Sequence, residues 1–75
     1  MDRAKLLDHV EQAKKQVADD ELKIAHQETL ISKLSQSGRA TIEAYAFLRT
    51  LEDRKAMHVA RRDRLAQELA TTNPE

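Results

Sequence analysis

The chain has 75 residues, 35% of them charged and 3% aromatic, and its 13 Lys and Arg balance its 13 Asp and Glu. A chain of this length forms one domain at most, and without cysteine it can form neither a disulfide nor a thiolate metal site. Because the charges balance, the chain as a whole has no net charge that would attract it to nucleic acid. The sequence contains neither the apolar core of a signal peptide nor an apolar run long enough to span a membrane, so we expect a cytoplasmic protein with no membrane contact.

The first predicted element is a helix over about residues 2–36. Apolar residues recur there at spacings of three and four, which is the pattern of one helix face. Asp2 is suited to accept backbone N–H bonds at its start, and Gly38, the only glycine, suits the left-handed conformation just past its end. The apolar series consists of Leu6, Val10, Ala13, Val17, Ile24, Ile31 and Leu34, with Asp20 and Gln27 at its two polar positions.

The second predicted element is a helix over about residues 41–70. Thr41 is the expected N-cap, and Pro74 disfavours helical geometry at the residue before it. We therefore expect a single domain over residues 1–70 and a disordered tail over residues 71–75. The apolar series here consists of Ala44, Leu48, Leu51, Leu65 and Leu69, interrupted by Lys55, His58 and Arg62.

The two series predict an all-α fold, an antiparallel two-helix coiled-coil hairpin, because both keep close to a 3.5-residue period. Folding at Gly38 brings together residues whose numbers sum to about 75. Leucines then meet at the open end of the hairpin, which is the end away from Gly38, and Asp20 falls opposite Lys55. This pair would fix the register, but the favoured interpretation is that both side chains point outward at an open edge. The candidate register and polar-seam residues are Asp20, Gln27, Lys55, His58 and Arg62.

A lone pair of helices can shield only one side of each apolar stripe. Further apolar residues lie beside the seam, so we expect two hairpins to form a homodimeric four-helix bundle. The alternative is a monomeric hairpin with scattered exposed apolar residues. The candidate interaction surface consists of Leu7, Ala18, Leu22, Ala25, Tyr45, Ala56 and Val59.

Catalytic and metal-binding patterns are not found in the sequence. No histidine has another three or four residues away, and adjacent carboxylates diverge by about 100° on a helix. We therefore expect no enzyme, no cofactor and no metal. His58 is expected to form an interhelix hydrogen bond or to lie at the seam edge, with a pH-sensing role as the less favoured alternative.

The predicted function is a non-enzymatic protein–protein interaction or scaffold module. It would act as a homo-oligomer, with a further protein as a possible partner. The alternative is a small nucleic-acid-binding hairpin dimer that uses a face formed by Arg54, Arg61 and Arg64. Acidic residues are interleaved with these arginines and no aromatic side chain is placed to stack on bases, so a solvated charged face is favoured.

Three short motifs extend across both predicted helices: I-A-x-Q at residues 24–27, G-x-x-T-x-E-A at 38–44 and H-V-A-x-R-D-R-L at 58–65. Over about residues 9–69 the chain resembles a group of short bacterial two-helix proteins of uncharacterised function. The resemblance implies no activity. It implies a small helical protein or module in which Gln27, His58 and residues 62–64 belong to a shared pattern. The chain departs from that pattern at Lys14, Lys15 and Ala40.

Overall fold

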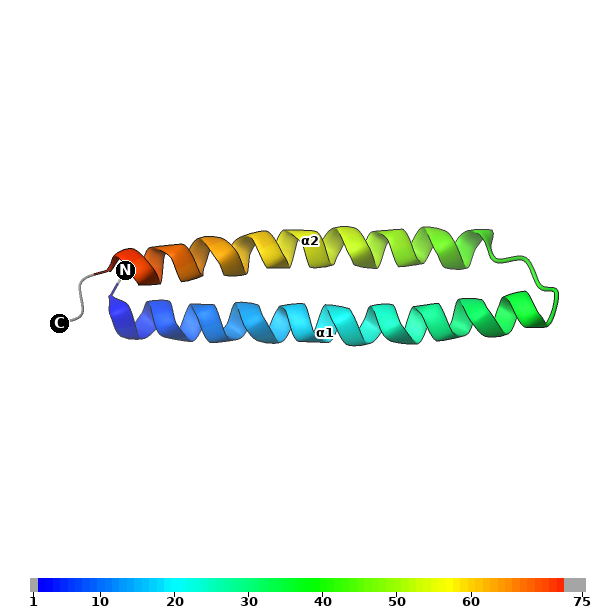
Figure 1. The fold of residues 1–75 in the computed structure, drawn as a ribbon, viewed down its shortest axis with the longest axis horizontal. Coiled ribbons are helices and arrows are strands. Elements are labelled where there is room, and N and C mark those ends of the chain that lie inside the picture. Colours follow the sequence, from blue (N-terminus) through cyan, green and yellow to red (C-terminus); the bar gives the residue numbers. More distant parts are fainter. Residues whose placement is uncertain (1, 73–75) are drawn as a thin grey trace.

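The computed structural model describes residues 2–72 and contains two helices in that range, α1 (Arg3–Gln36) and α2 (Ile42–Thr71). They run antiparallel along a rod whose long axis measures 60 Å, and the start of α1 lies beside the end of α2 (Figure 1). The predicted all-α hairpin and the predicted helix bounds are therefore confirmed to within a residue at each end. Of the expected tail over residues 71–75, Thr71 is the last residue of α2, and residues 73–75 lie outside the described residues.

Local chemistry at the ends of α1 follows the sequence closely. The Asp2 side chain accepts a 2.8 Å hydrogen bond from the backbone N–H of Lys5. Past the other end Gly38 has a φ of 74°, in the left-handed region that glycine adopts without a steric penalty. The N–H of Gly38 donates to Ser35 O and that of Arg39 to Leu34 O, at 3.1 and 2.9 Å. These two bonds form a Schellman motif, which satisfies carbonyls that α1 leaves unpaired.

The start of α2 differs from the expectation in one respect. Thr41 is the residue that precedes the helix, and its carbonyl accepts from the N–H of Tyr45 at 2.9 Å. Its side chain makes no capping hydrogen bond, so the predicted cap is right in position and wrong in chemistry. The reason is its backbone, since a ψ of 1° departs from the extended conformation in which a cap side chain reaches the first turn.

The seam between the helices is buried unevenly. Most of its buried residues belong to α1, whereas among the described residues of α2 only Leu51 and Leu65 are buried. At the open end of the hairpin, Leu65 packs with three buried residues of α1, and Leu69 packs against that group, as the layer pairing predicts. The α1 members of this apolar cluster are Leu6, Val10 and Ala13. Much of the seam face of α2 therefore stays partly open to solvent.

Candidate interaction surfaces

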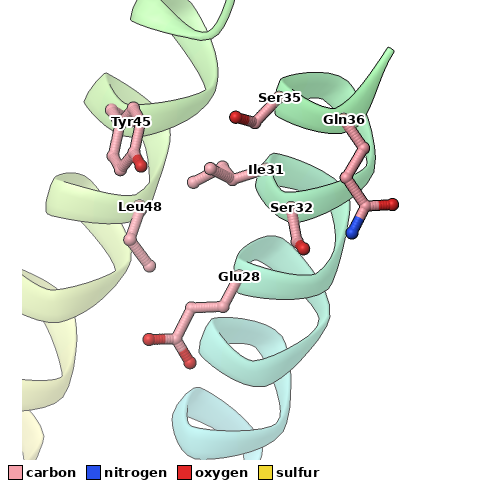
Figure 2. A pocket seen from close by; sticks show the side chains of 7 residues that line it. All are labelled: Glu28, Ile31, Ser32, Ser35, Gln36, Tyr45 and Leu48. Carbon is pink, nitrogen blue, oxygen red and sulfur yellow. The ribbon is translucent and has the colours of Figure 1, made fainter.

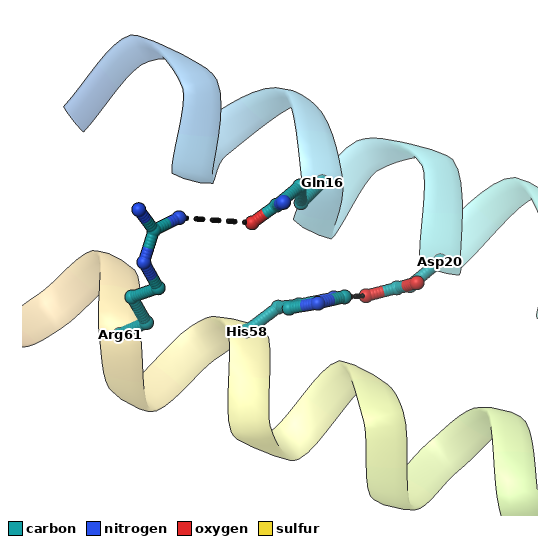
Figure 3. A network of polar contacts seen from close by, with 4 residues as sticks. All are labelled: Gln16, Asp20, His58 and Arg61. Carbon is teal, nitrogen blue, oxygen red and sulfur yellow. Dashed lines mark hydrogen bonds and ion pairs between the residues drawn. The ribbon is translucent and has the colours of Figure 1, made fainter. Parts of the chain in front are cut away.

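A buried acid–histidine pair joins the helices at the middle of the seam. Asp20 of α1 is 3% exposed, and its Oδ2 accepts a hydrogen bond from Nδ1 of His58 on α2 (Figure 3). A buried carboxylate needs such a partner, because burial without one is strongly unfavourable. The predicted interhelix hydrogen bond of His58 is confirmed. The expectation that Asp20 points outward, or else pairs with Lys55, is wrong.

The reason for this correction lies in which edge of the seam each side chain occupies. Asp20 and His58 lie on the same edge, whereas Lys55 belongs to the other edge of α2 and is half-buried there. The Asp20 side chain is short, so its carboxylate reaches the His58 ring, which lies on the same edge of the seam. Residues whose numbers sum to about 75 lie at one level along the rod, but they can occupy either of the two edges of the seam.

A second polar contact lies one turn from the first. Nη1 of Arg61 donates to Oε1 of Gln16 at 3.1 Å, and Figure 3 shows the two contacts side by side. Arg61 was expected only as part of a basic stripe, and Gln16 was not expected to take part in the site. Gln16 lies four residues before Asp20 and therefore on the same face of α1, and this spacing is the sequence signal that could have identified Gln16.

The other candidate seam residues have different environments. Gln27 is buried and its Nε2 donates to the carbonyl of Ala44 at 2.9 Å, so it joins the two helices near the turn. Arg62 is half-buried, and its Nε donates to Asp63 on its own helix at 3.1 Å. Among the described residues, every buried side-chain nitrogen or oxygen has a partner. Gln16, Asp20 and Gln27 therefore use their side-chain polar atoms to hold the two helices together.

The hairpin has two long sides, one on each side of the seam, and a shallow pocket marks each of them near the turn. The first, of about 370 Å³, lies between α1 and α2 with Tyr45 and Leu48 facing Ile31 (Figure 2). The second, of about 290 Å³, is lined by Lys23, His26, Gln27, Leu30, Phe47 and Leu51. Tyr45 and Phe47 are two residues apart on α2 and therefore lie on opposite sides of the hairpin.

The side that carries Tyr45 is rich in alanine, and we call it the alanine flank. Residues seven apart share a side in a coiled coil, so its small and apolar members can be assigned by that repeat. They include Leu7, Ala18, Ala25, Tyr45, Ala56 and Val59. Its charged members are Glu11, Glu21, Glu28, Glu52 and Asp63, against Lys14 and Arg49. Six of the seven candidate surface residues lie on this flank, and Leu22, 56% exposed, lies next to it on the outer edge of α1.

The opposite side carries Phe47 and an excess of basic residues, and we call it the basic flank. Its six bases are Lys5, Lys23, Lys33, Arg54, Arg61 and Arg64, and its three acids are Asp19, Glu43 and Glu68. Leu30, Phe47 and Met57 are exposed on the same flank. The neutral chain therefore has three more acids than bases on one flank and three more bases than acids on the other. Counting charge by halves of the sequence conceals this separation, because each helix contributes to both flanks.

Two further kinds of site, a metal centre and a membrane span, were sought in the described part of the chain. Within residues 2–72 there is no group of three or more His, Asp or Glu side chains that could hold a metal ion. Neither α1 nor α2 contains a stretch that is both long enough and apolar enough to cross a bilayer. Comparison with models of protein families, with curated proteins and with solved structures found no match. The two flanks and the seam are therefore the features of this hairpin that bear on its function.

Proposed function

We propose that this chain is a non-enzymatic interaction module that works by self-association, with a four-helix assembly of two hairpins as its smallest unit. The observation that carries the proposal is the uneven burial. Only two residues of α2 are buried, whereas large apolar side chains are exposed along both helices. Among the described residues, the exposed large apolar ones are Leu7, Leu22, Leu30, Ile42, Tyr45, Phe47 and Met57.

A second hairpin would supply what one seam lacks. Domains below about 70–80 residues rarely gain more than about 3–5 kcal/mol from one core, and natural examples add disulfides, metals or partners. This chain has no cysteine. A partner would supply the missing burial, and another copy of the chain is a partner that is present at matching concentration. A different protein that presents an apolar helix would satisfy the same surface.

The test is the mass of the protein in solution. Light scattering behind a sizing column should give at least twice the chain mass of 8.6 kDa at tens of micromolar. Replacing Leu7 and Val59 of the alanine flank together by glutamate should lower that mass, because charge would then lie among the apolar contacts. Gln67→Glu, at an exposed polar position, is the matched control. A mass near 8.6 kDa for the unaltered chain at every concentration would contradict the proposal.

The charge separation supports a second candidate function, binding of nucleic acid by the basic flank. Arg54 and Arg64 are exposed there, and lysines of α1 extend the same flank. Two features count against it: three acids share the flank, and Arg61 already donates to Gln16. Replacing Arg54 and Arg64 by glutamine should weaken the binding of a labelled duplex, and should leave self-association intact if the flank serves nucleic acid alone.

A further inference from the structure

We propose that the hairpins stack side by side in the same orientation, with the alanine flank of one copy on the basic flank of the next. The inference depends on the self-association proposed above and specifies its geometry. It predicts an assembly that continues to grow with concentration, in contrast to a closed dimer. The partner that fits either flank is thus a second copy of this chain.

Oppositely charged residues stand two apart on each helix. Such residues lie about 200° apart around the helix axis, so they occupy opposite flanks at the same level along the rod. Glu52 and Arg54 form such a pair on α2, and Glu21 and Lys23 form one on α1. If one copy is shifted sideways onto the next without rotation, Glu52 of the first lies opposite Arg54 of the second. Glu21 meets Lys23 in the same way.

Apolar residues follow the same rule. Tyr45 on the alanine flank and Phe47 on the basic flank are both more than half exposed, and sideways stacking brings the two rings to one level. Farther along α2, Val59 on the alanine flank and Met57 on the basic flank are also two residues apart and meet in the same way. Aromatic and aliphatic contacts would then provide the adhesion, while the charges select the orientation. One unfavourable pairing results, Glu21 with Asp19, and Lys23 lies four residues from Asp19 to offset it.

Charge also disfavours the symmetric arrangement. A two-fold dimer places the same flank of both copies face to face. Two alanine flanks would bring together two surfaces with an excess of acids, and two basic flanks would bring together two with an excess of bases. A shift without rotation instead joins two flanks of opposite net charge at every interface between copies. Such a contact leaves one flank free at each end, so the assembly does not close.

The flanks are large enough for this contact. The rod is 60 Å long and 14 Å wide between backbone positions, which gives a side on the order of 800 Å². A stable protein interface of standard size covers about 800 Å² on each partner. Exposed ion pairs contribute little individually, so the contact should be weak and sensitive to salt.

The experiment measures mass against concentration by sedimentation and light scattering, at low salt and at about 300 mM salt, where the screening length is below about 8 Å. The unaltered chain should exceed the dimer mass and continue to grow, and salt should reduce that growth. Two variants test the charges: Glu21→Lys with Glu52→Lys on the alanine flank, and Lys23→Glu with Arg54→Glu on the basic flank. Each variant alone should need at least about tenfold more protein to associate.

Mixing the two variants should restore association, since each supplies the flank that the other has lost. One chain with all four substitutions should associate by itself. Asp8→Lys with Asp53→Lys is the matched control for the alanine-flank variant, because it makes the same change in charge on the outer edges of the helices, away from both flanks. Helix content by circular dichroism checks that each variant folds.

A mass that stops at the dimer and ignores these substitutions would overturn the stacking and leave the proposed function standing. A monomeric chain at every concentration would overturn both. Duplex binding by the basic flank without self-association would also overturn the stacking and assign that flank to nucleic acid.

Discussion

Asp20 and His58 are 38 residues apart in the chain and bond to each other across the seam, and Asp20 is the most deeply buried charged side chain of the described residues. Its carboxylate depends on one partner from the other helix. The pair is thus one of the polar contacts that join α1 to α2, and it can be tested by removing either side.

Replacing His58 by alanine should lower the free energy of unfolding by about 1–3 kcal/mol, because it leaves the Asp20 carboxylate buried without its partner. Replacing both residues by leucine should be neutral or stabilising, because the seam then continues as apolar layers. Urea denaturation at one fixed chain concentration measures both effects. His26→Ala, at an exposed site, is the control. A single and a double variant of equal stability would show that the contact does not stabilise the folded chain.

Replacing Gln27 by leucine should raise stability by about 1 kcal/mol, since it extends the apolar seam at a buried position. The carbonyl of Ala44 would lose the amide of Gln27 but would keep the bond that helical geometry gives it. Thermal and urea unfolding of the variant would measure the change. A clear loss of stability would mean that the bond between Gln27 and Ala44 matters more than the burial of an apolar side chain.

Replacing Gly38 by alanine should destabilise the hairpin by about 1–2 kcal/mol, because its φ of 74° is strained for a residue with a Cβ. Apart from Gly38 and its two neighbours in the chain, no residue has a heavy atom within 4 Å of the position that the new Cβ would occupy, so the penalty is one of backbone conformation. Asparagine tolerates the left-handed region better, and Gly38→Asn should therefore cost less than Gly38→Ala. Equal losses for the two would point to a steric cause.

Replacing Leu6 or Leu65 by alanine should destabilise the chain by about 2–5 kcal/mol, because both belong to the apolar cluster at the open end. Met57→Ala removes a side chain that is 68% exposed and should have a much smaller effect on unfolding. Denaturation monitored by helix content measures the stability of the three variants and so separates the buried positions from the exposed one. Similar losses at all three positions would show that Met57 is buried in solution, as it would be in an assembly.

The fold could be predicted because its determinants are local. Asp2 and Gly38 define the ends of α1 through the chemistry of single residues, and the leucine spacing defines the seam. The partner of Asp20 could not be predicted from that spacing, because level along the rod does not say which edge of the seam a side chain occupies. Thr41 makes no side-chain capping bond because of its backbone conformation in the turn, and residue propensities do not specify that conformation. The separation of charge appears only when residues are sorted by flank in three dimensions.

The apolar cluster at the open end has a mechanical consequence. Because the start of α1 and the end of α2 lie side by side, a force that pulls these two helix ends apart loads the layers of the seam one after another. The first layers to carry that load hold Leu6 and Leu65, the core of the molecule, and the weaker polar layers follow behind them. The hairpin should therefore resist tension with one early peak of force and then unzip to the turn at Gly38.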